Sequence, residues 1–368
     1  MANFDIANIA VQMVCPNNRV QIDEAGLPSV LVYIPAFKNS DVLTGGDDNT
    51  HPAFIVNGEE IQGFYYSKYE NVVHNGMAYS LPGIDPATAT SAPYARSYCE
   101  AKGSGWHLST AAEWAAIALW CKKNGFLPYG NTWMGKDPRE NTYKAVKTST
   151  YSNADTTGRV ATGTGPLTWS HDGTAAGIFD LCGNVEEIQA GMRLVCGELQ
   201  ILANNDAADP SNSQDDTSAC WKAINASTGA LVEPECSYGI DASVAPLSGN
   251  TIRLDYVNST WTYRTVIGSS ETTRRSCTFA SVTCDSSIVE AAQVLLRALA
   301  LLPDTGEIGY EDSMFSLNNR SSIRQFYRGG GYTSSATGGR LFNISNVNLN
   351  THACGFRCAY IPELEKEV

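Results

Sequence analysis

Residues 328–357, near the C-terminus, most restrict what this chain can fold into. They read RGGGYTSSATGGRLFNISNVNLNTHACGFR, and the 24 residues 331–354 among them contain no Lys, Glu, Asp, Gln, Met, Trp or Pro. Glycine is abundant, and Thr, Asn and Ser compete with the backbone for hydrogen bonds, which disfavours a long helix. We therefore expect irregular backbone and short strands, with glycines at the turns.

The residue types missing from 331–354 also fit a coding pattern. All residues there belong to the fifteen amino acids that can be reached when only the first two bases of an AAC codon vary. The five types that this scheme excludes (Trp, Lys, Glu, Gln and Met) make up 50 of the 368 residues of the chain. A Gly-, Ser- and Asn-rich loop that merely lacks charge would show the same absence, so both interpretations stay open on this feature alone.

Composition and charge exclude several classes of protein. A chain of 368 residues allows one large or two ordinary domains, and 43% hydrophobic residues indicate a globular protein. The net charge of −13 argues against nucleic acid or an anionic membrane as partner. No signal peptide is recognisable, so we expect synthesis in the cytoplasm. No membrane insertion is expected, because the longest mainly apolar stretch, 288–302, is too short to span a bilayer.

Eleven cysteines, an odd number without a CxxC pair, indicate reduced thiols in the absence of a secretion signal. Two pairs, Cys277 with Cys284 and Cys354 with Cys358, are close enough in sequence to form disulfides in an oxidising environment. Spacing alone leaves both states open.

The first half of the chain begins with strand patterns. Residues 1–52 are predicted to be an N-terminal β segment, with an apolar strand at Val30–Phe37. A hairpin is expected over Phe54–Val72, with its turn at Asn57-Gly58. Phe64 and Tyr66 should mark one face of its second strand.

Two helices are then predicted. The first starts with Ser91 as N-cap, ends at Gly103, and carries the apolar stripe Tyr94, Ala95, Tyr98 and Cys99. The second starts at the capping box Thr110-Ala-Ala-Glu113 and ends near 124–125, with Trp114, Ile117, Ala118 and Cys121 on its apolar face.

The region after the second helix is less regular. Residues 126–178 are rich in turns, and residues 200–310 have the character of an insertion. The insertion should carry strands at Thr251–Val257 and Trp261–Val266. It should also carry a buried helix over 288–302 that starts at a capping box of Ser287 and Glu290.

Catalytic signatures are missing from the sequence. The five histidines form no HxxxH pair, no Cys/His cluster has zinc spacing, and there is no GxSxG, Walker or dinucleotide motif. Asp180, Asn184, Glu186 and Glu187 do place several oxygen ligands in one tight turn, where Gly183 can expose backbone carbonyls. A hard cation such as Ca²⁺ needs about 6–8 oxygens of this kind, but the same residues also suit an ordinary turn.

Five motifs, taken in order, resemble the formylglycine-generating-enzyme (sulfatase-modifying factor) branch of the C-type lectin fold. They are GFYYSKYE (63–70), WHLSTAAEWAAIA (106–118), FDLCGNVEE (179–187), FYRGGGY (326–332) and GFRCA (355–359). The resemblance implies an α+β fold in which two helices pack on short antiparallel sheets with much irregular loop. It implies one C-type-lectin-like domain over 53–362, apart from the 200–310 insertion.

The same resemblance argues against catalysis. The two cysteines that hold copper in the formylglycine-generating enzyme correspond here to Ser334 and Gly339, so no copper and no enzyme activity are expected. Glu186 and Ile188 depart from the GNVWEW that relatives often have. The resemblance still implies structural Ca²⁺ ligands at Asp180 and Glu187, with backbone oxygens of Gly183 and Val185.

The other branch of the fold comprises the variable proteins of diversity-generating retroelements, in which a variable region ends at GFR. On this resemblance, residues 331–354 form a hypervariable ligand-binding site, and Arg328 and Arg357 brace it from outside. The predicted ligand-binding residues are Tyr332, Thr333, Ser334, Ser335, Thr337, Arg340, Phe342, Asn343, Ser345, Asn346, Asn348, Asn350 and His352.

The predicted function is therefore binding of a protein or cell-surface ligand by a retroelement-diversified protein of a phage or bacterium. An oligomer is compatible with this function, as is arrival at a virion or cell surface by a route other than a signal peptide. Two alternatives stay open: an oxidase of the formylglycine class with a relocated active site, and a structural component of a phage tail or surface assembly.

Overall fold

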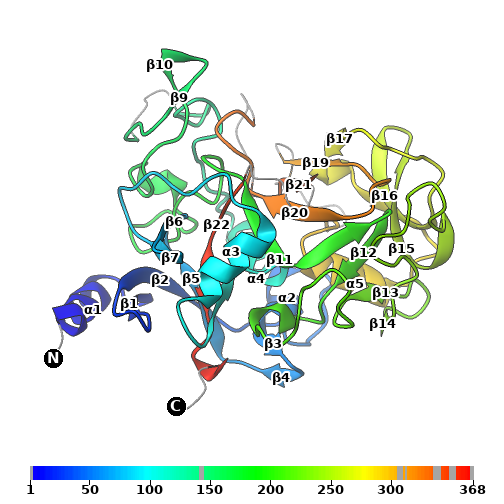
Figure 1. The fold of residues 1–368 in the computed structure, drawn as a ribbon, viewed down its shortest axis with the longest axis horizontal. Helices are drawn as coiled ribbons and strands as arrows, with labels where there is room; N and C mark the ends of the chain where they lie inside the picture. Colours follow the sequence, from blue (N-terminus) through cyan, green and yellow to red (C-terminus); the bar gives the residue numbers. More distant parts are fainter. Residues whose placement is uncertain are drawn as a thin grey trace.

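The computed structural model describes residues 3–140, 145–304, 310, 313–334, 341–347 and 354–364. It is an α+β protein in which few helices accompany a large curled mixed sheet and a smaller antiparallel one (Figure 1). The described α-helices are α1 (Asn3–Val14), α2 (Asn39–Val42), α3 (Ala92–Glu100), α4 (Ala111–Lys123) and α5 (Glu290–Ala298). Short 3₁₀ helices are η1 (Pro52–Phe54), η2 (Leu167–Trp169), η3 (Asp206–Ala208), η4 (Phe279–Ser281) and η5 (Pro362–Leu364).

The smaller sheet joins the two ends of the chain. Its strand order is β1-β2-β5-β23-β8, and every neighbouring pair is antiparallel. The strands are β1 (Asn18–Ile22), β2 (Pro28–Pro35), β5 (Gly63–Ser67), β8 (Trp106–Leu108) and β23 (Cys358–Tyr360). The C-terminal strand β23 therefore lies inside this sheet, which fixes the chain just after the GFR motif.

The larger sheet has the order β17-β19-β21-β20-β11-β12-β15-β16-β18, with β13, β14 and β22 attached to its side. Most pairs are antiparallel, whereas β19–β21, β16–β18 and β11–β22 are parallel. Its strands are β11 (Glu187–Val195), β12 (Glu198–Ile201), β13 (Lys222–Ile224), β14 (Leu231–Val232), β15 (Ser248–Val257), β16 (Thr260–Val266), β17 (Arg275–Thr278), β18 (Thr283–Cys284), β19 (Met314–Leu317), β20 (Arg324–Arg328), β21 (Ile344–Val347) and β22 (Gly355–Phe356).

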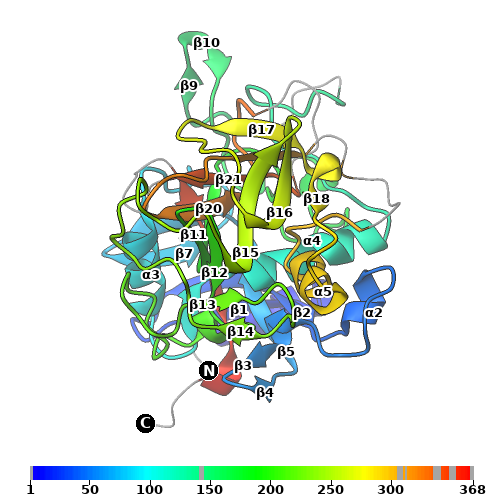
Figure 2. The same ribbon diagram turned by 90° about the vertical axis from the view of Figure 1, so that its right-hand side faces the viewer.

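Three two-stranded ribbons complete the strands described. They are β3 (Ile55–Val56) with β4 (Glu59–Glu60), β6 (Asn71–His74) with β7 (Met77–Ser80), and β9 (Thr150–Tyr151) with β10 (Asn153–Thr157). The β9–β10 ribbon projects from the body of the protein in both views (Figures 1 and 2).

Helix α3 packs on strands of both sheets, and α4 packs on the larger one. Helix α3 contacts β8 and β11, and α4 contacts β11, η1 and α5. The capping box of α4 is confirmed: the Thr110 hydroxyl accepts from the Glu113 amide at 3.1 Å, and the Glu113 carboxylate accepts from the Thr110 amide at 3.0 Å. In α3, Ala95 and Cys99 are buried as predicted, but Tyr94 is 55% exposed.

The hairpin turn at Asn57-Gly58 is confirmed, since both residues have positive φ, as a two-residue turn of this type requires. It closes only the short β3–β4 ribbon. The strand that carries Phe64 and Tyr66 is β5, which pairs with β2 and β23 instead. Both side chains are fully buried on one face, as predicted.

The prediction of a purely β segment over 1–52 is wrong at its start, because α1 occupies Asn3–Val14. Strands β1 and β2 of this segment pair within the smaller sheet, whose other strands come from later in the chain. The predicted strands of the 200–310 insertion exist as β15 and β16. They belong to the same sheet as β11 and β20, so the 200–310 region enlarges the larger sheet.

Helix α5 is shorter than predicted and starts differently. Val289 is its N-cap residue, without a side-chain cap hydrogen bond, so the predicted Ser287–Glu290 capping box is wrong. Its buried residues are Ala292, Leu296, Arg297 and Ala298, and the other face is partly exposed. No helix in the described residues combines the length and the apolar character that crossing a bilayer requires.

All eleven cysteines are free thiols. The sulfur of Cys358 lies 2.6 Å from that of Cys99, in the core between α3 and β23. Burial raises the pKa of the Cys99 thiol well above its ordinary value. This pair comes from distant parts of the chain, which is why neither pairing considered from sequence spacing includes it.

His51 makes the stability of the fold depend on pH. Its ring is fully buried: Nε2 donates to the Ala298 carbonyl at 2.8 Å, and Nδ1 accepts from the Ala53 amide at 3.2 Å. Burial lowers the pKa of His51 to about 4, against the weaker raising effect of the bond to Ala298. A histidine with a lowered folded pKa takes up a proton more readily in the unfolded chain. Stability is therefore lost as pH falls from about 6.5 towards 4.

We expect His51→Gln to be less stable than the wild type at pH 7, because glutamine does not reproduce the packing and the two hydrogen bonds of the buried ring. The gap should narrow by about 2–3 kcal/mol between pH 7 and pH 4.5, since only the wild type loses stability through His51. Urea unfolding across this pH series measures the gap, and a constant gap would contradict the assignment.

Candidate functional site

The segment 331–354, called here the variable segment, leaves the large sheet at the end of β20. Arg328 closes β20 and is 1% exposed. Its guanidinium donates to the carbonyls of Leu299 and Ala300, at 3.0 and 3.1 Å, and so satisfies the C-terminal end of α5. Burial lowers the pKa of Arg328 to about 10. The entry to the variable segment is thus held by an interior arginine, as predicted.

A turn of glycines then passes over the 181–184 turn. Gly329 has φ of +80°, and a Cβ there would lie 2.8 Å from the Leu181 carbonyl oxygen, so only glycine fits. The Gly329 carbonyl accepts from the Gly183 amide at 3.0 Å. Next, the Tyr332 carbonyl accepts from the Met134 amide at 2.7 Å. The first residues of the segment therefore rest on two other loops.

The exit from the segment is held more strongly. Gly355 and Phe356 form β22, parallel to the start of β11. Arg357 is fully buried, and its Nε lies 2.9 Å from both carboxylate oxygens of Glu187. Its terminal nitrogens donate to the carbonyls of Phe179 and Ser67, at 2.7 and 3.2 Å. The bracing role predicted for Arg357 is confirmed by these bonds.

Three buried carboxyl groups surround Arg357: Glu70, Asp180 and Glu187, each 1% exposed. Burial raises the pKa of Glu187 to about 7 and that of Asp180 to about 6, although Arg357 opposes both shifts. Burial also raises the pKa of Glu70 well above its ordinary value. For Arg357, burial lowers the pKa, but attraction to Glu187 and Glu70 outweighs this and raises it. The guanidinium of Arg357 is thus the positive charge that faces all three carboxyl groups.

The predicted calcium ligands lie within this cluster, but most of their side-chain oxygens have protein partners. Both oxygens of Glu187 face Arg357, and Oδ2 of Asp180 accepts from the Gly163 amide at 2.8 Å. Oδ1 of Asp180 is buried without a partner among the described residues. Calcium binding therefore stays a prediction: Asp180 offers one oxygen, and Glu187 would have to exchange Arg357 for the ion.

The backbone of Gly183 and Val185 is held by the same turn. The Val185 amide donates to Glu70 at 3.2 Å, and Asn184 donates to the other Glu70 oxygen at 2.6 Å. Within the described ranges, no group of three or more His, Cys, Asp or Glu side chains has an arrangement that could hold a metal.

The middle of the variable segment is part of the core, which corrects four of the predicted ligand contacts. Phe342 is 1% exposed, with its ring centroid 4.7 Å from that of Tyr310 and 5.5 Å from that of Phe279. Strand β21 lies between β19 and β20 in the large sheet (Figure 1). The remaining three corrected residues, Asn343, Ser345 and Asn346, are 7%, 3% and 2% exposed.

Two polar side chains of β21 form hydrogen bonds with the backbone of β19 and of Asn318, which follows β19. The Asn346 amide exchanges two hydrogen bonds with the backbone of Asn318, at 3.0 and 3.3 Å. The Ser345 hydroxyl donates to the Ser316 carbonyl at 2.8 Å. Residues of this kind were predicted to be adaptable surface contacts, but sheet pairing turns them inward.

The exposed part of the segment among the described residues is its beginning. Thr333 is exposed, and Tyr332 and Ser334 are half-buried. The ring of Tyr332 meets that of Tyr151, on the projecting β9–β10 ribbon, edge to face at 5.7 Å. Gly331 donates its amide to the Ser334 hydroxyl at 2.6 Å. These three side chains are at least partly exposed, beside an aromatic neighbour. The other predicted contacts, Ser335, Thr337, Arg340, Asn348, Asn350 and His352, lie outside the described residues.

Sequence reasoning missed three residues that shape this region. Glu70 ends the GFYYSKYE motif, and Asn131 donates to the Asn184 side chain at 3.1 Å. Arg274 donates to the Tyr327 hydroxyl at 2.8 Å and to the Asn346 carbonyl at 2.9 Å. Only Glu70 had a signal in the sequence, through its position in a motif.

Comparison with known proteins adds little to this description. No family model matches the chain, and no curated protein matches it. Among solved structures, the chain is similar to PvdO from Pseudomonas aeruginosa, with 12% sequence identity over 90% of this chain and 94% of that chain. The TM-score of this pair is 0.33, and we infer no fold family or activity from it.

Proposed function

We propose that this protein has a C-type lectin fold of the formylglycine-generating-enzyme type and displays a ligand-binding site that a retroelement diversifies. The ligand is a protein or cell-surface molecule, and the host is a phage or bacterium. The observation that carries the proposal is the combination at 331–354: five residue types are missing there, and the segment starts and ends at arginines buried in the core. A frame held at both ends tolerates changes of side chain at the exposed positions between them.

The positions available for diversification are narrower than the whole segment. Tyr332, Thr333 and Ser334 can change without disturbing the core, because they are exposed or half-buried. Phe342 and Asn346 cannot, since their side chains pack or bond inside the sheet. Tyrosine and small hydrogen-bonding residues are also the types that antibody loops use for contact. The proposed ligand surface therefore starts at Tyr332 and excludes the buried part of β21.

Sequencing the DNA beside this gene and in sibling isolates tests the proposal. We expect a near-identical repeat of the 331–354 coding region, differing where the template has adenine, beside a reverse transcriptase gene. Codons for Tyr332 and Thr333 should vary among siblings, whereas those for Phe342 and Asn346 should keep their residue. A solitary gene that is invariant across isolates would contradict the proposal.

A further inference from the structure

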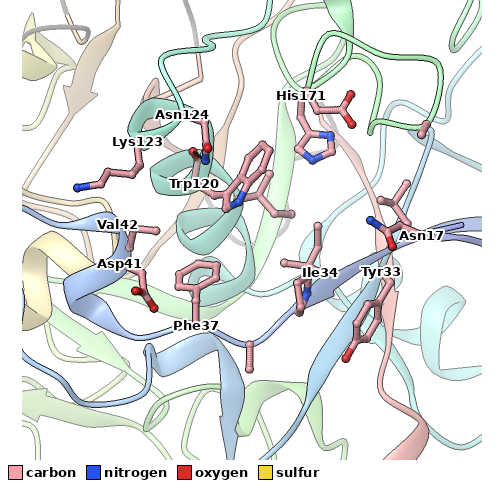
Figure 3. A pocket seen from close by; sticks show the side chains of 16 residues that line it. Asn17, Tyr33, Ile34, Phe37, Asp41, Val42, Trp120, Lys123, Asn124 and His171 are labelled. Atoms are coloured by element: carbon pink, nitrogen blue, oxygen red, sulfur yellow. Dashed lines mark hydrogen bonds between the residues drawn. The ribbon is translucent and has the colours of Figure 1, made fainter. Parts of the chain in front are cut away.

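A cavity of about 450 Å³ lies on the protein between β2, α2, the last turns of α4 and the 171–176 loop (Figure 3). Pockets that bind small molecules have volumes of about 300–1,000 Å³. None of its lining residues belongs to 328–357, so it is separate from the variable segment. Its function is not part of the proposal made above.

The walls of the cavity are mainly apolar. Val32 and Ile34 come from β2, Val42 from α2 and Ile117 from α4, and all four are buried. Phe37, which is half-buried, stands at the side opposite Ile34 in Figure 3. These residues provide a surface on which an apolar ring would lose contact with water.

Two aromatic N–H groups reach this apolar space. Trp120 and His171 lie side by side, with ring centroids 5.4 Å apart (Figure 3). Nδ1 of His171 accepts from the Ile178 amide at 2.8 Å, which leaves the proton of the neutral ring on Nε2. Burial lowers the pKa of His171 to about 4, so the ring is neutral at pH 7. Among the described residues, neither Trp120 Nε1 nor His171 Nε2 has a hydrogen-bond partner.

The charges at the mouth of the cavity have both signs. Lys123 lies at the end of α4, Asp41 on α2 and Asp172 on the 171–176 loop. Asp41 accepts from the Lys38 amide, and Asp172 accepts from Thr174. Two carboxylates against one ammonium disfavour an anionic ligand, and the apolar walls disfavour any charged group deeper in the cavity, because it would lose its hydration there.

We propose that this cavity binds an uncharged planar aromatic molecule that carries a carbonyl oxygen. The ring contacts Phe37 and Trp120, and the carbonyl oxygen accepts from the free N–H groups of Trp120 and His171. The chemistry of the pocket suits this class: the apolar walls match a ring, and the two N–H donors, which have no acceptor among the described residues, match an acceptor on the ligand.

Benzamide is a probe of this class, and the indole N–H signals of the full-length protein in ¹⁵N-labelled form report its binding. The chain has seven tryptophans, and the signal of Trp120 is the one missing from Trp120→Phe. We expect benzamide to shift this signal saturably at low-millimolar concentration, as is usual for a ligand of this size. Cyclohexanecarboxamide, which has the same amide but no aromatic ring, should bind about threefold to tenfold more weakly.

A matched pair of variants locates the binding. Ala36 is exposed at the mouth of the cavity, and Ala36→Trp should abolish the shift. Ala154 is equally an exposed alanine, but it lies on the projecting β10, and Ala154→Trp should leave benzamide binding unchanged. Should Ala36→Trp fail to fold, Ala176→Trp replaces it, because Ala176 also lines the cavity and is partly exposed.

Three outcomes would overturn the proposal: no saturable shift of the Trp120 signal, equal binding of cyclohexanecarboxamide, or unchanged binding in the folded mouth variant. Because these readouts depend only on the cavity, they are independent of whether the variable segment binds a ligand.

Discussion

Arg357→Met lowers the free energy of unfolding by about 3–5 kcal/mol, which is the usual cost of removing one partner from a buried ion pair. The physical reason is that the buried Glu187 loses its cationic partner and must either stay charged without it or take up a proton, while Glu70 and Asp180 lie nearby. The carbonyls of Ser67 and Phe179 also lose their donor. Urea unfolding monitored by tryptophan fluorescence measures the change.

The loss of unfolding free energy in Arg357→Met should depend on pH. Glu187 and Asp180 have folded pKa values of about 7 and about 6, above those of the unfolded chain. Groups of this kind favour folding when protonated, so their contribution is lost as pH rises from about 4 to about 7. Without Arg357 the pKa of Glu187 rises further, because the guanidinium lowers it in the wild type. The deficit should therefore grow as pH rises above 6.

Two further variants separate charge from packing. Adding Glu187→Gln to Arg357→Met should recover part of the lost stability, because the uncompensated charge disappears. Arg275→Met is the matched control, since Arg275 pairs with Glu271 at the surface and is 51% exposed. It should change stability little. Equal losses in Arg275→Met and Arg357→Met would contradict the role given to the buried pair.

Phe342→Ala is expected to cost about 3–5 kcal/mol of unfolding free energy, the range for removing a large side chain from a core. Phe342 is 1% exposed and contacts the rings of Phe279 and Tyr310. Alanine would leave a cavity that those rings cannot fill without moving. Thermal or urea unfolding detects the loss.

Thr333→Ala, nine residues earlier in the same segment, is the comparison for Phe342→Ala. Thr333 is exposed, and surface substitutions usually change stability by less than about 0.5 kcal/mol. If Phe342→Ala were as mild as Thr333→Ala, the assignment of β21 to the core would be wrong.

Much of the local structure could be predicted because it depends on neighbours in sequence. The capping box at Thr110 and Glu113 is a contact over three residues, and the Asn57-Gly58 turn needs only two residues with positive φ. The helix α1 was missed because much of its apolar surface stays exposed, for example Met13 at 81%. A pattern that marks a buried face is absent there.

The candidate site could be predicted in part for the same reason. Glycines and arginines flank 331–354 in the sequence, and their bracing role follows from their positions. The burial of Phe342 and Asn346 could not be predicted, because it depends on β21 pairing with β19 and β20. A segment without charge is compatible with either a solvated loop or an interior strand, and only its partners decide between them.

The sequence alone determined the two central helices, several strands and the unusual composition of 331–354, since these features follow from local propensity and residue identity. The tertiary structure alone decided that Arg357 meets Glu187 across 170 positions, that the 200–310 region extends the central sheet, and that Trp120 and His171 converge on one cavity. These contacts join residues far apart in the chain, and their geometry depends on how whole sheets and helices pack, which no short stretch of sequence encodes.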